Sequence, residues 1–238
     1  MATSCTPTPF ILRKSLLCTL KSLEKNHLHS FSRMEGSEVI EEITETQVTS
    51  KKKIFVAGAT GSTGKRIVEQ LLAKGFEVKA GVRDVEKAKS NFVKDNPSLQ
   101  IVKADVTDGS AKLAEAIGDD SEAVICATGF RPGWDLFAPW KAICYSPKLQ
   151  AEQYIRRSGI KYTIIRPGGL KNDPPSGNVV MEPEDTLYEG NISRDLVAEV
   201  AVEALVHPES SYKVVEIVSR AEAPRRTYND LFGSIKQR

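Results

Sequence analysis

The chain has 238 residues, 40% of them hydrophobic and 27% charged, and its formal net charge is +2. This length allows one sizeable domain rather than two. The small net charge argues against a nucleic-acid-binding surface, and no run reaches the roughly 18 apolar residues that cross a membrane. The four cysteines match no zinc or redox spacing, and the three histidines are too scattered for a metal site or a histidine-based triad.

The N-terminal part of the chain differs in composition from the rest. Residues 1–33 contain five basic residues and one acid, Glu24, and are rich in serine and threonine. This balance is typical of an organelle transit peptide, and the Met-Ala-Thr-Ser start favours a plastid over a mitochondrion. A merely disordered tail is the alternative. Residues 34–52 are acidic and polar and predict a disordered linker, which leaves 53–238 for the folded domain.

A glycine-rich turn follows the first apolar run of this domain. Residues 53–57 predict a buried strand, glycines follow at three-residue spacing, and residues 65–74 have the apolar periodicity of a helix. In such a turn, backbone N–H groups approach a pyrophosphate at the positive end of the helix. An ordinary tight turn is the alternative. The candidate cofactor contacts in this turn are Gly58, Thr60, Gly61, Ser62, Thr63 and Gly64.

Further strand and helix patterns alternate after this turn. Strands are predicted at 77–83, 99–103, 123–127, 162–165 and 214–218, and helices at 85–89, 110–117, 194–206 and 228–235. Asp84 and Ser193 are the predicted N-caps of two of these helices. Alternation of this kind predicts an α/β fold with a doubly wound, Rossmann-like parallel sheet.

The end of the second predicted strand indicates which dinucleotide binds. Arg83 lies 19 positions after Gly64, where an acid would accept the 2′-hydroxyl of NAD and an arginine pairs with the 2′-phosphate of NADP. Lys65 or Arg66 could add positive charge near the same phosphate. Asp84 follows at once and makes this assignment less sharp, although its other role is to cap the helix that follows. On balance, Arg83 favours NADP over NAD.

Three motifs resemble a known family. The string Val56-Ala57-Gly58-Ala59-Thr60-Gly61-x-x-Gly64 resembles the atypical short-chain dehydrogenase/reductases, in their NAD(P)H-binding (NmrA-like, NAD(P)-dependent epimerase/dehydratase-related) branch. Residues 166–173, Arg-Pro-Gly-Gly-Leu-Lys-Asn-Asp, and 193–198, Ser-Arg-Asp-Leu-Val-Ala, resemble a plant plastid group of that branch. The resemblance runs from about Lys52 to about Lys236.

The resemblance assigns further cofactor contacts. It implies that Asp105 and Val106 flank the adenine, although turn chemistry is an alternative for Asp105. It also implies that the backbone of Pro167 and Gly168 lines the nicotinamide end. The small residues Ala127 and Gly129, at the end of the fourth predicted strand, leave room for the cofactor to pass.

One segment is too short for a complete domain. Between Gly129 and Tyr162 lie 32 residues, whereas a helix, a strand and a second helix need more than about 40. Prolines interrupt this stretch and argue against a central strand. The sheet is therefore predicted to lack about one βα unit between residues 130 and 150. We expect either an open edge on the fourth strand, or the strand at 162–165 lying directly beside it.

The missing segment is where the family keeps its catalytic residues. The resemblance implies a Tyr-x-x-x-Lys pair, with the tyrosine as proton donor or acceptor. Lys148 matches the lysine by its context, Lys-Leu-Gln-Ala-Glu, but Tyr145 precedes it by three residues across Pro147. Lys148 and Tyr145 are thus the catalytic candidates, and no serine can be assigned. We expect a shortened family member that binds cofactor but catalyses poorly.

The sequence therefore predicts an NADP(H)-binding, oxidoreductase-like chloroplast protein with an unknown small-molecule substrate. A non-catalytic dinucleotide sensor or scaffold on a plastid complex or membrane is the alternative. The location within the plastid, in the stroma or peripherally at a thylakoid or plastoglobule, stays open. An RNA-associated factor is a third reading, which the mild charge disfavours.

Overall fold

The computed structural model describes residues 10–13, 51–92, 96–129 and 150–236. The elements of the first half are β1 (Phe10–Arg13), β2 (Lys53–Ala57), α1 (Ser62–Ala73), β3 (Glu77–Val82), α2 (Val85–Lys89), β4 (Leu99–Lys103), α3 (Ser110–Ile117) and β5 (Ala123–Cys126). After a helical segment at 150–157, the second half contains β6 (Lys161–Pro167), β7 (Gly169–Lys171), β8 (Asn178–Pro183), β9 (Asn191–Ser193), α5 (Arg194–Val206), the 3-10 helix η2 (Pro208–Ser210), β10 (Lys213–Arg220) and α6 (Tyr228–Ser234).

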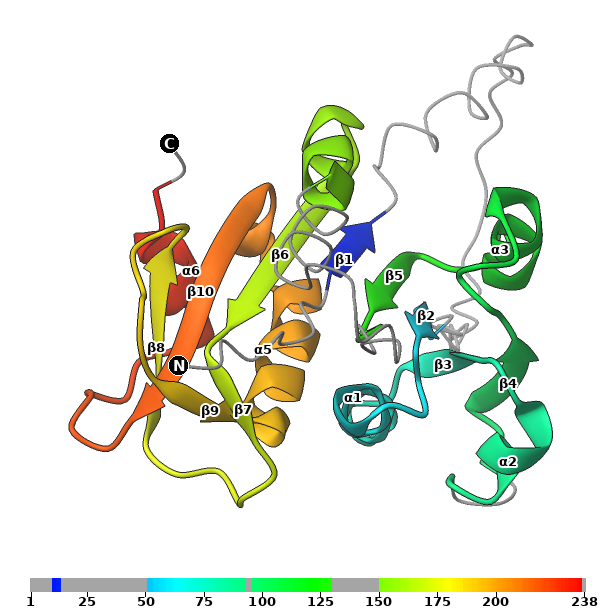
Figure 1. Ribbon diagram of the computed structural model, residues 1–238, viewed down its shortest axis with the longest axis horizontal. Helices are drawn as coiled ribbons and strands as arrows, with labels where there is room; N and C mark the ends of the chain where they lie inside the picture. The colour runs from blue at the N-terminus through cyan, green and yellow to red at the C-terminus, as the bar shows by residue number, and fades with distance from the viewer. Residues whose placement is uncertain (1–9, 14–50, 93–95, 130–149, 237–238) are drawn as a thin grey trace, which may run out of the picture.

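The described strands form one sheet in the order β4-β3-β2-β5-β1-β6-β10-β9-β7, with β8 paired to β10. β4, β3, β2 and β5 pair in parallel, and so do β6 and β10. Short apolar strands alternating with helices therefore give the predicted doubly wound, Rossmann-like fold. In Figure 1, β2–β5 with α1–α3 lie on one side of the molecule, and β6–β10 with α5 and α6 lie on the other.

The place beside β5 differs from what we expected. β1 lies between β5 and β6 and is antiparallel to both of them. The fourth strand of the Rossmann order therefore has no open edge, and β6 does not pair with it. Both expectations were wrong because they considered only strands that follow the glycine loop in the chain, whereas the pairing segment precedes it.

Helices α1 and α5 join the two halves of the sheet on one face. The buried side chains of α1 are apolar at Ile67, Val68 and Leu71, which recur at helical spacing. At their rim, the Arg66 Nε donates to Asp195 over 2.9 Å and Lys74 Nζ to Glu203 over 2.6 Å. The apolar packing and these ion pairs hold α1 against α5.

Local caps fix where the helices begin. Asp84 accepts a hydrogen bond from the Lys87 backbone N–H over 3.0 Å, and Ser193 accepts one from Leu196 over 3.2 Å. Both caps were predicted, and they place the starts of α2 and α5 at the carboxyl ends of β3 and β9. No helix within the described ranges is long and apolar enough to cross a bilayer.

Candidate functional site: the glycine loop and a pocket at the end of β6

The glycine loop connects β2 to α1 and packs against the end of β5. Gly58 has φ +74°, and a Cβ there would lie 3.1 Å from the carbonyl carbon of Ala127. A Cβ at Gly64 would lie only 2.1 Å from the Gly58 carbonyl oxygen. Only glycine fits at both places, because the loop folds back on the first turn of α1. The turn is closed by a 2.9 Å hydrogen bond from Gly61 N–H to the Gly58 carbonyl.

The first turn of α1 presents donors without a protein cap. The N-cap is Gly61, which has no side chain, and the first turn contains no acid. The first N–H groups of a helix lack partners within it and carry a partial positive charge. The Thr63 Oγ1 beside them is buried and, among the described residues, has no hydrogen-bond partner. Donors at a compact, uncapped glycine loop fit a pyrophosphate.

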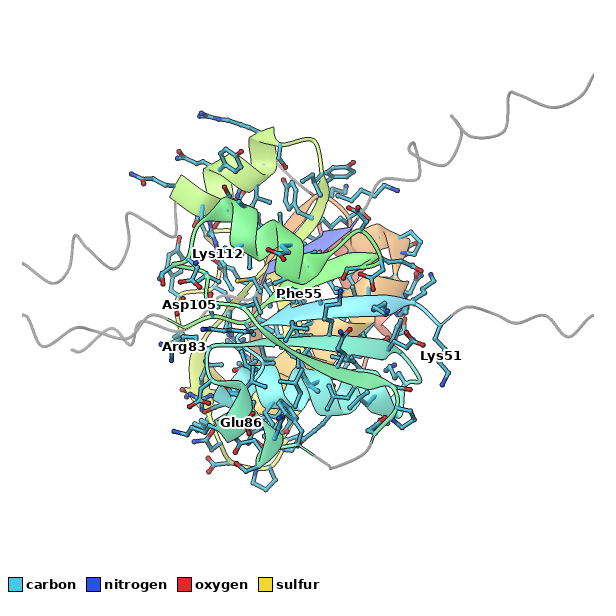
Figure 2. The ribbon with its side chains drawn as sticks, turned by 90° about the vertical axis from the view of Figure 1, so that its right-hand side faces the viewer. Lys51, Phe55, Arg83, Glu86, Asp105 and Lys112 are labelled. Carbon is cyan, nitrogen blue, oxygen red and sulfur yellow. The ribbon has the colours of Figure 1, made fainter. Side chains whose placement is uncertain are left out.

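Arg83 and Asp105 lie at the same edge of the sheet as the glycine loop. They follow the carboxyl ends of the neighbouring strands β3 and β4, and Figure 2 shows both at the edge opposite Lys51. Arg83 is exposed. Within the described residues, no hydrogen bond or salt bridge engages its guanidinium, so this charge is available to a ligand.

Asp105 has a structural function of its own. Its carboxylate accepts hydrogen bonds from the Thr107 backbone N–H (2.9 Å) and the Thr107 hydroxyl (2.8 Å). These bonds, together with the charge of Arg83, lower the pKa of Asp105. Asp105 thus makes the turn that the sequence allowed as its alternative role. The turn leaves Val106 48% exposed at this edge.

Unlike Arg83, the two basic residues of α1, Lys65 and Arg66, have partners within the protein. Arg66 donates to the Ser62 carbonyl over 2.7 Å as well as to Asp195, so it links α1 to α5. Lys65 lies 3.8 Å from Glu69 on the exposed face of the helix. Of the basic residues considered for the 2′-phosphate, only Arg83 therefore has neither a hydrogen bond nor a salt bridge to another described residue.

The end of β5 forms the floor of the loop. Ala127 is buried, and its N–H donates to the Ala57 carbonyl over 2.9 Å, which continues the β2–β5 pairing. Gly129 follows as an exposed residue at the limit of the described segment. Because Ala127 and Gly129 are small, they leave space at the end of β5, as the sequence predicts for a cofactor that crosses this strand end.

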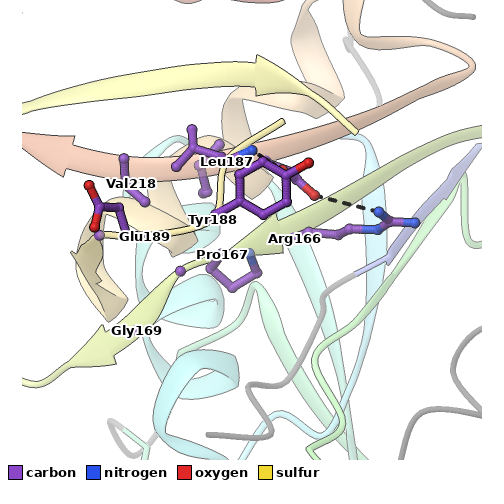
Figure 3. Close-up of a pocket in the computed structure, with 11 residues that line it drawn as sticks. Arg166, Pro167, Gly169, Leu187, Tyr188, Glu189 and Val218 are labelled. Atoms are coloured by element: carbon purple, nitrogen blue, oxygen red, sulfur yellow. Dashed lines mark hydrogen bonds and ion pairs between the residues drawn. The ribbon is translucent and has the colours of Figure 1, made fainter. Parts of the chain in front are cut away.

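A cavity of about 290 Å³ begins at the other predicted contact, Pro167 and Gly168. Its walls are the end of β6, the loop before β9 and the middle of β10. Apolar side chains and glycine backbone provide most of the lining, and Tyr188, which is 90% exposed, lies beside Pro167 at the opening (Figure 3). The lining residues are Arg166, Pro167, Gly168, Gly169, Leu187, Tyr188, Glu189, Gly190, Glu216, Ile217 and Val218.

Glu216 organises the loop that closes this cavity. Its carboxylate accepts the backbone N–H groups of Asp185 (2.9 Å), Thr186 (3.1 Å) and Leu187 (2.7 Å). Sequence reasoning missed this residue. The available signal was a single charge within the otherwise apolar run of β10.

Arg166 is held by acids of the protein itself. It donates to Glu152 over 2.7 Å and to Asp185 over 2.8 Å, and lies 3.5 Å from Glu216. Burial alone would lower the pKa of Arg166, but the hydrogen bonds and charges of Glu152 and Asp185 raise it. Arg166 therefore fixes the 150–157 helix to the cavity wall.

The catalytic candidates Tyr145 and Lys148 lie outside the described residues. The structure places the predicted cofactor contacts at the carboxyl edge of β2–β5 and at the end of β6. Among the described residues, no group of three or more histidines, cysteines and acids is arranged to hold a metal ion.

The family model for NAD(P)H-binding proteins matches residues 58–138 and 130–208. The chain belongs to this NAD(P)H-binding family. It is 62% identical to the chloroplastic protein At2g34460 of Arabidopsis thaliana, over 78% of this chain and 83% of that protein. It is also 30% identical to TIC 62 of Pisum sativum, over 72% of this chain but only 43% of TIC 62.

Solved structures show the same fold. The oxidoreductase ylbE of Lactococcus lactis matches with a TM-score of 0.60 at 21% identity, over 76% of this chain and 95% of ylbE. A short-chain dehydrogenase/reductase of Veillonella parvula in complex with NADP matches with a TM-score of 0.53 at 16% identity, over 74% and 99%. Identities this low establish the fold only. The fold and family that the motifs predicted are thus confirmed.

The comparisons also bear on the short segment of this NAD(P)H-binding protein. The alignment with the Arabidopsis relative spans 233 positions, but 78% of 238 residues is only about 186. About 47 positions of that relative therefore have no counterpart here. The family model matches in two pieces that meet at residues 130–138, where the sequence predicts the missing unit.

Proposed function

We propose that this chain is a chloroplast NADP(H)-binding protein of the oxidoreductase type, in which cofactor binding is preserved and turnover is weak. The observation that carries the proposal is the glycine loop packed on Ala127 beside an unengaged Arg83. The loop supplies N–H donors for the pyrophosphate, and Arg83 supplies a planar cation for a 2′-phosphate. NADPH, when bound, supplies a hydride.

The preference for NADP over NAD rests on Arg83. An acid that accepts the ribose hydroxyls of NAD belongs at the end of the second strand, and this chain has an arginine there. Asp105, whose charge reaches that arginine, already accepts two hydrogen bonds from Thr107. The NADP complex of the Veillonella relative is compatible with this preference.

The substrate would enter the cavity beside Pro167 and Gly168. The size of this cavity is at the lower end of the range for small-molecule sites. Pro167, Leu187, Ile217 and Val218 give it an apolar wall, and Arg166 and Glu216 are engaged within the protein. These features favour a small, mostly apolar substrate.

Binding is tested with the full chain and its Arg83→Ala variant. Pairing with the 2′-phosphate is a charge-assisted interaction worth about 1.5–3 kcal/mol, or roughly tenfold to hundredfold in Kd. Titration should show tighter binding of NADPH than of NADH, and Arg83→Ala should remove the difference without changing NADH binding. Arg157→Ala, which alters an arginine on the 150–157 helix, is the matched control. Equal affinities of the parent chain for both dinucleotides would contradict the NADP preference.

Turnover is tested by restoring the missing segment. A general acid contributes about 10²–10⁴ in rate, so a chain carrying the corresponding segment of the Arabidopsis relative should oxidise NADPH far faster. Quinones, enones and aldehydes form the substrate panel. Equal rates, abolished by Tyr145→Phe in the short chain, would show that Tyr145 and Lys148 form a working pair.

A non-catalytic dinucleotide sensor or scaffold is the second candidate. The short 130–150 segment favours it, because the family's proton donor belongs there. NADPH binding without turnover in either the short or the restored chain would support this candidate over an oxidoreductase.

A further inference from the structure

The strand β1 occupies an interior position of the sheet, although it comes from the N-terminal end of the chain. Its register pairs Phe10 with Cys126 of β5 on one side and with Ile164 of β6 on the other. Arg13 pairs in the same way with Ala123 and Lys161. All four residues of β1 are thus paired on both sides, and Figure 1 shows the strand as the blue arrow between β5 and β6.

This position is the one that the missing strand would fill. In the order 3-2-1-4-5-6, the fifth strand lies between the fourth and the sixth. Here β5 is the fourth strand of that order and β6 follows the short segment. The described part of the short segment, residues 150–160, contains a helix and no strand. The sheet therefore contains a gap one strand wide, which β1 fills.

The gap requires a backbone partner on both sides. Ile125, Thr163 and Ile164 along its edges are each at most 1% exposed. Buried N–H and C=O groups without hydrogen-bond partners destabilise the folded state. Only an extended segment offers donors and acceptors to two edges at once. The gap is thus selective for a strand and not for a helix or a small molecule.

β1 is not the only element that holds β5 and β6 in position on the two sides of the gap. The two halves of the sheet are also joined by α1 and α5, through buried apolar faces and the Arg66–Asp195 ion pair. The Gln70 amide adds a 3.0 Å hydrogen bond to the Asp195 carbonyl. The helices keep β5 and β6 at a distance that one strand bridges.

We infer that the gap between β5 and β6 is a strand-binding site and that its occupant is the chain's own segment Phe10–Arg13. This segment replaces the deleted strand in the opposite direction, which a short antiparallel ladder permits. The same residues lie within the proposed transit peptide, so removal of that peptide also empties the site. Folding of the sheet and retention of the N-terminal segment are therefore coupled.

A disulfide trap tests the pairing in the full chain. Cys126 is free and half-buried, and its Cα partner is Phe10. Phe10→Cys, in a chain whose Cys5, Cys18 and Cys144 are replaced by serine, should form an intramolecular disulfide between the introduced thiol and Cys126 under mild oxidation. Opposed residues of antiparallel strands lie about 4.5–5.5 Å apart between Cα atoms, within the range for disulfides.

Ile11→Cys is the matched control. Ile11 pairs with Ile125, and adjacent strand positions face opposite sides of a sheet. Peptide mapping by mass spectrometry should find about tenfold less disulfide with Cys126 from position 11 than from position 10. The disulfide does not form readily from position 11 because the two Cα–Cβ bonds point away from each other. Equal yields, or none from position 10, would overturn the assignment. Bonds between two chains would also overturn it, because they assign the site to the strand of a second copy.

Hydrogen exchange gives a second, independent measurement. Leu12→Pro removes a donor from the middle of β1 and should deprotect Ala123–Cys126 and Lys161–Ile164, while β2 and β3 stay protected. Leu17→Pro, the same substitution outside β1, should leave both stretches protected. Unchanged protection in Leu12→Pro, or equal loss in the two variants, would contradict the inference, whereas loss of fold in Leu12→Pro alone would support it.

Discussion

The tightest contact of the glycine loop provides a sharp test of the site. Gly64 lies in the first turn of α1, and an added Cβ would be 2.1 Å from the Gly58 carbonyl oxygen and 2.9 Å from its carbon. Both neighbours are backbone atoms, so no side-chain rotation relieves the contact. Gly64→Ala therefore forces the loop away from the helix.

The size of the effect follows from the distances. Ordinary contact to a Cβ begins at 3.4 Å, so the separation must grow by about 1.3 Å, the difference between 3.4 and 2.1 Å. Overpacking of this kind costs about 1–3 kcal/mol. For a domain of this size the loss corresponds to a Tm lower by about 2–12 °C. A loop displaced by about 1 Å also no longer aims its N–H groups at the pyrophosphate, and NADPH affinity should fall about tenfold or more.

Thermal unfolding and NADPH titration measure the two effects on the same samples. Gly233→Ala is the control, because Gly233 lies within α6 and a Cβ there meets nothing within 4 Å. Alanine is a better helix residue than glycine by about 0.5–1 kcal/mol, so this control should gain stability slightly. A Gly64→Ala chain with the parent Tm and the parent Kd would refute the loop geometry described above.

Three further predictions concern other parts of the chain. The carboxylate of Asp120 accepts hydrogen bonds from Lys53 and Lys79, both over 2.8 Å, and these bonds lower its pKa well below the ordinary value. Because this pKa is lower in the folded state, Asp120 stabilises the fold at pH values above its pKa in the unfolded chain. Asp120→Asn should therefore lower Tm at neutral pH, and the difference should vanish in acid as the native carboxylate protonates. Unfolding scans from neutral to acid pH check this, and a pH-independent difference would contradict it. Glu216→Gln replaces one acceptor oxygen by a donor and should lower the free energy of unfolding in denaturant by about 1–3 kcal/mol, with increased proteolysis at residues 185–187. Parent-like stability would contradict the proposal that Glu216 holds this loop in place. A fluorescent protein fused behind Met1–Val48 should reach chloroplasts, and a cytosolic signal would end the transit-peptide proposal.

Much of the first half could be predicted because its signals are local. The apolar run of β2, the glycine spacing and the periodicity of α1 lie close together in the sequence, and the structure has a strand, a glycine loop and a helix in that order. The helix begins at Ser62, three residues before its predicted start, because the last part of the predicted turn forms the first turn of α1. The caps at Asp84 and Ser193 are equally local, since each contacts an N–H three residues away. Local chemistry of this kind is visible in one sequence.

The features that could not be predicted depend on contacts between residues that are far apart in the sequence. Strands β7 and β9 have three residues each, which is too few for a periodic pattern. They pair with each other, and β9 also pairs with β10, so their position depends on strands that are distant in sequence. The partner of Arg66 is Asp195, 129 residues later, so the sequence could not distinguish it from the unengaged Arg83. Phe10–Arg13 showed only a short apolar run, and its pairing depends on a gap created by residues that are missing elsewhere.

The position of that gap is the physical reason for our proposal that cofactor binding is preserved while turnover is weak. The pyrophosphate loop and Arg83 depend on β2, β3 and the end of β5, all of which precede the short segment. The cavity beside Pro167 depends on β6 and β10, which follow it. The short segment therefore leaves both the loop and the cavity in place. By resemblance, the strand and helix that it is too short to contain are those that carry the family's serine and tyrosine. In the arrangement that we infer, β1 restores the backbone pairing of a strand without restoring those side chains. It can therefore support the sheet while the N-terminal segment is retained, but it does not supply the proton donor.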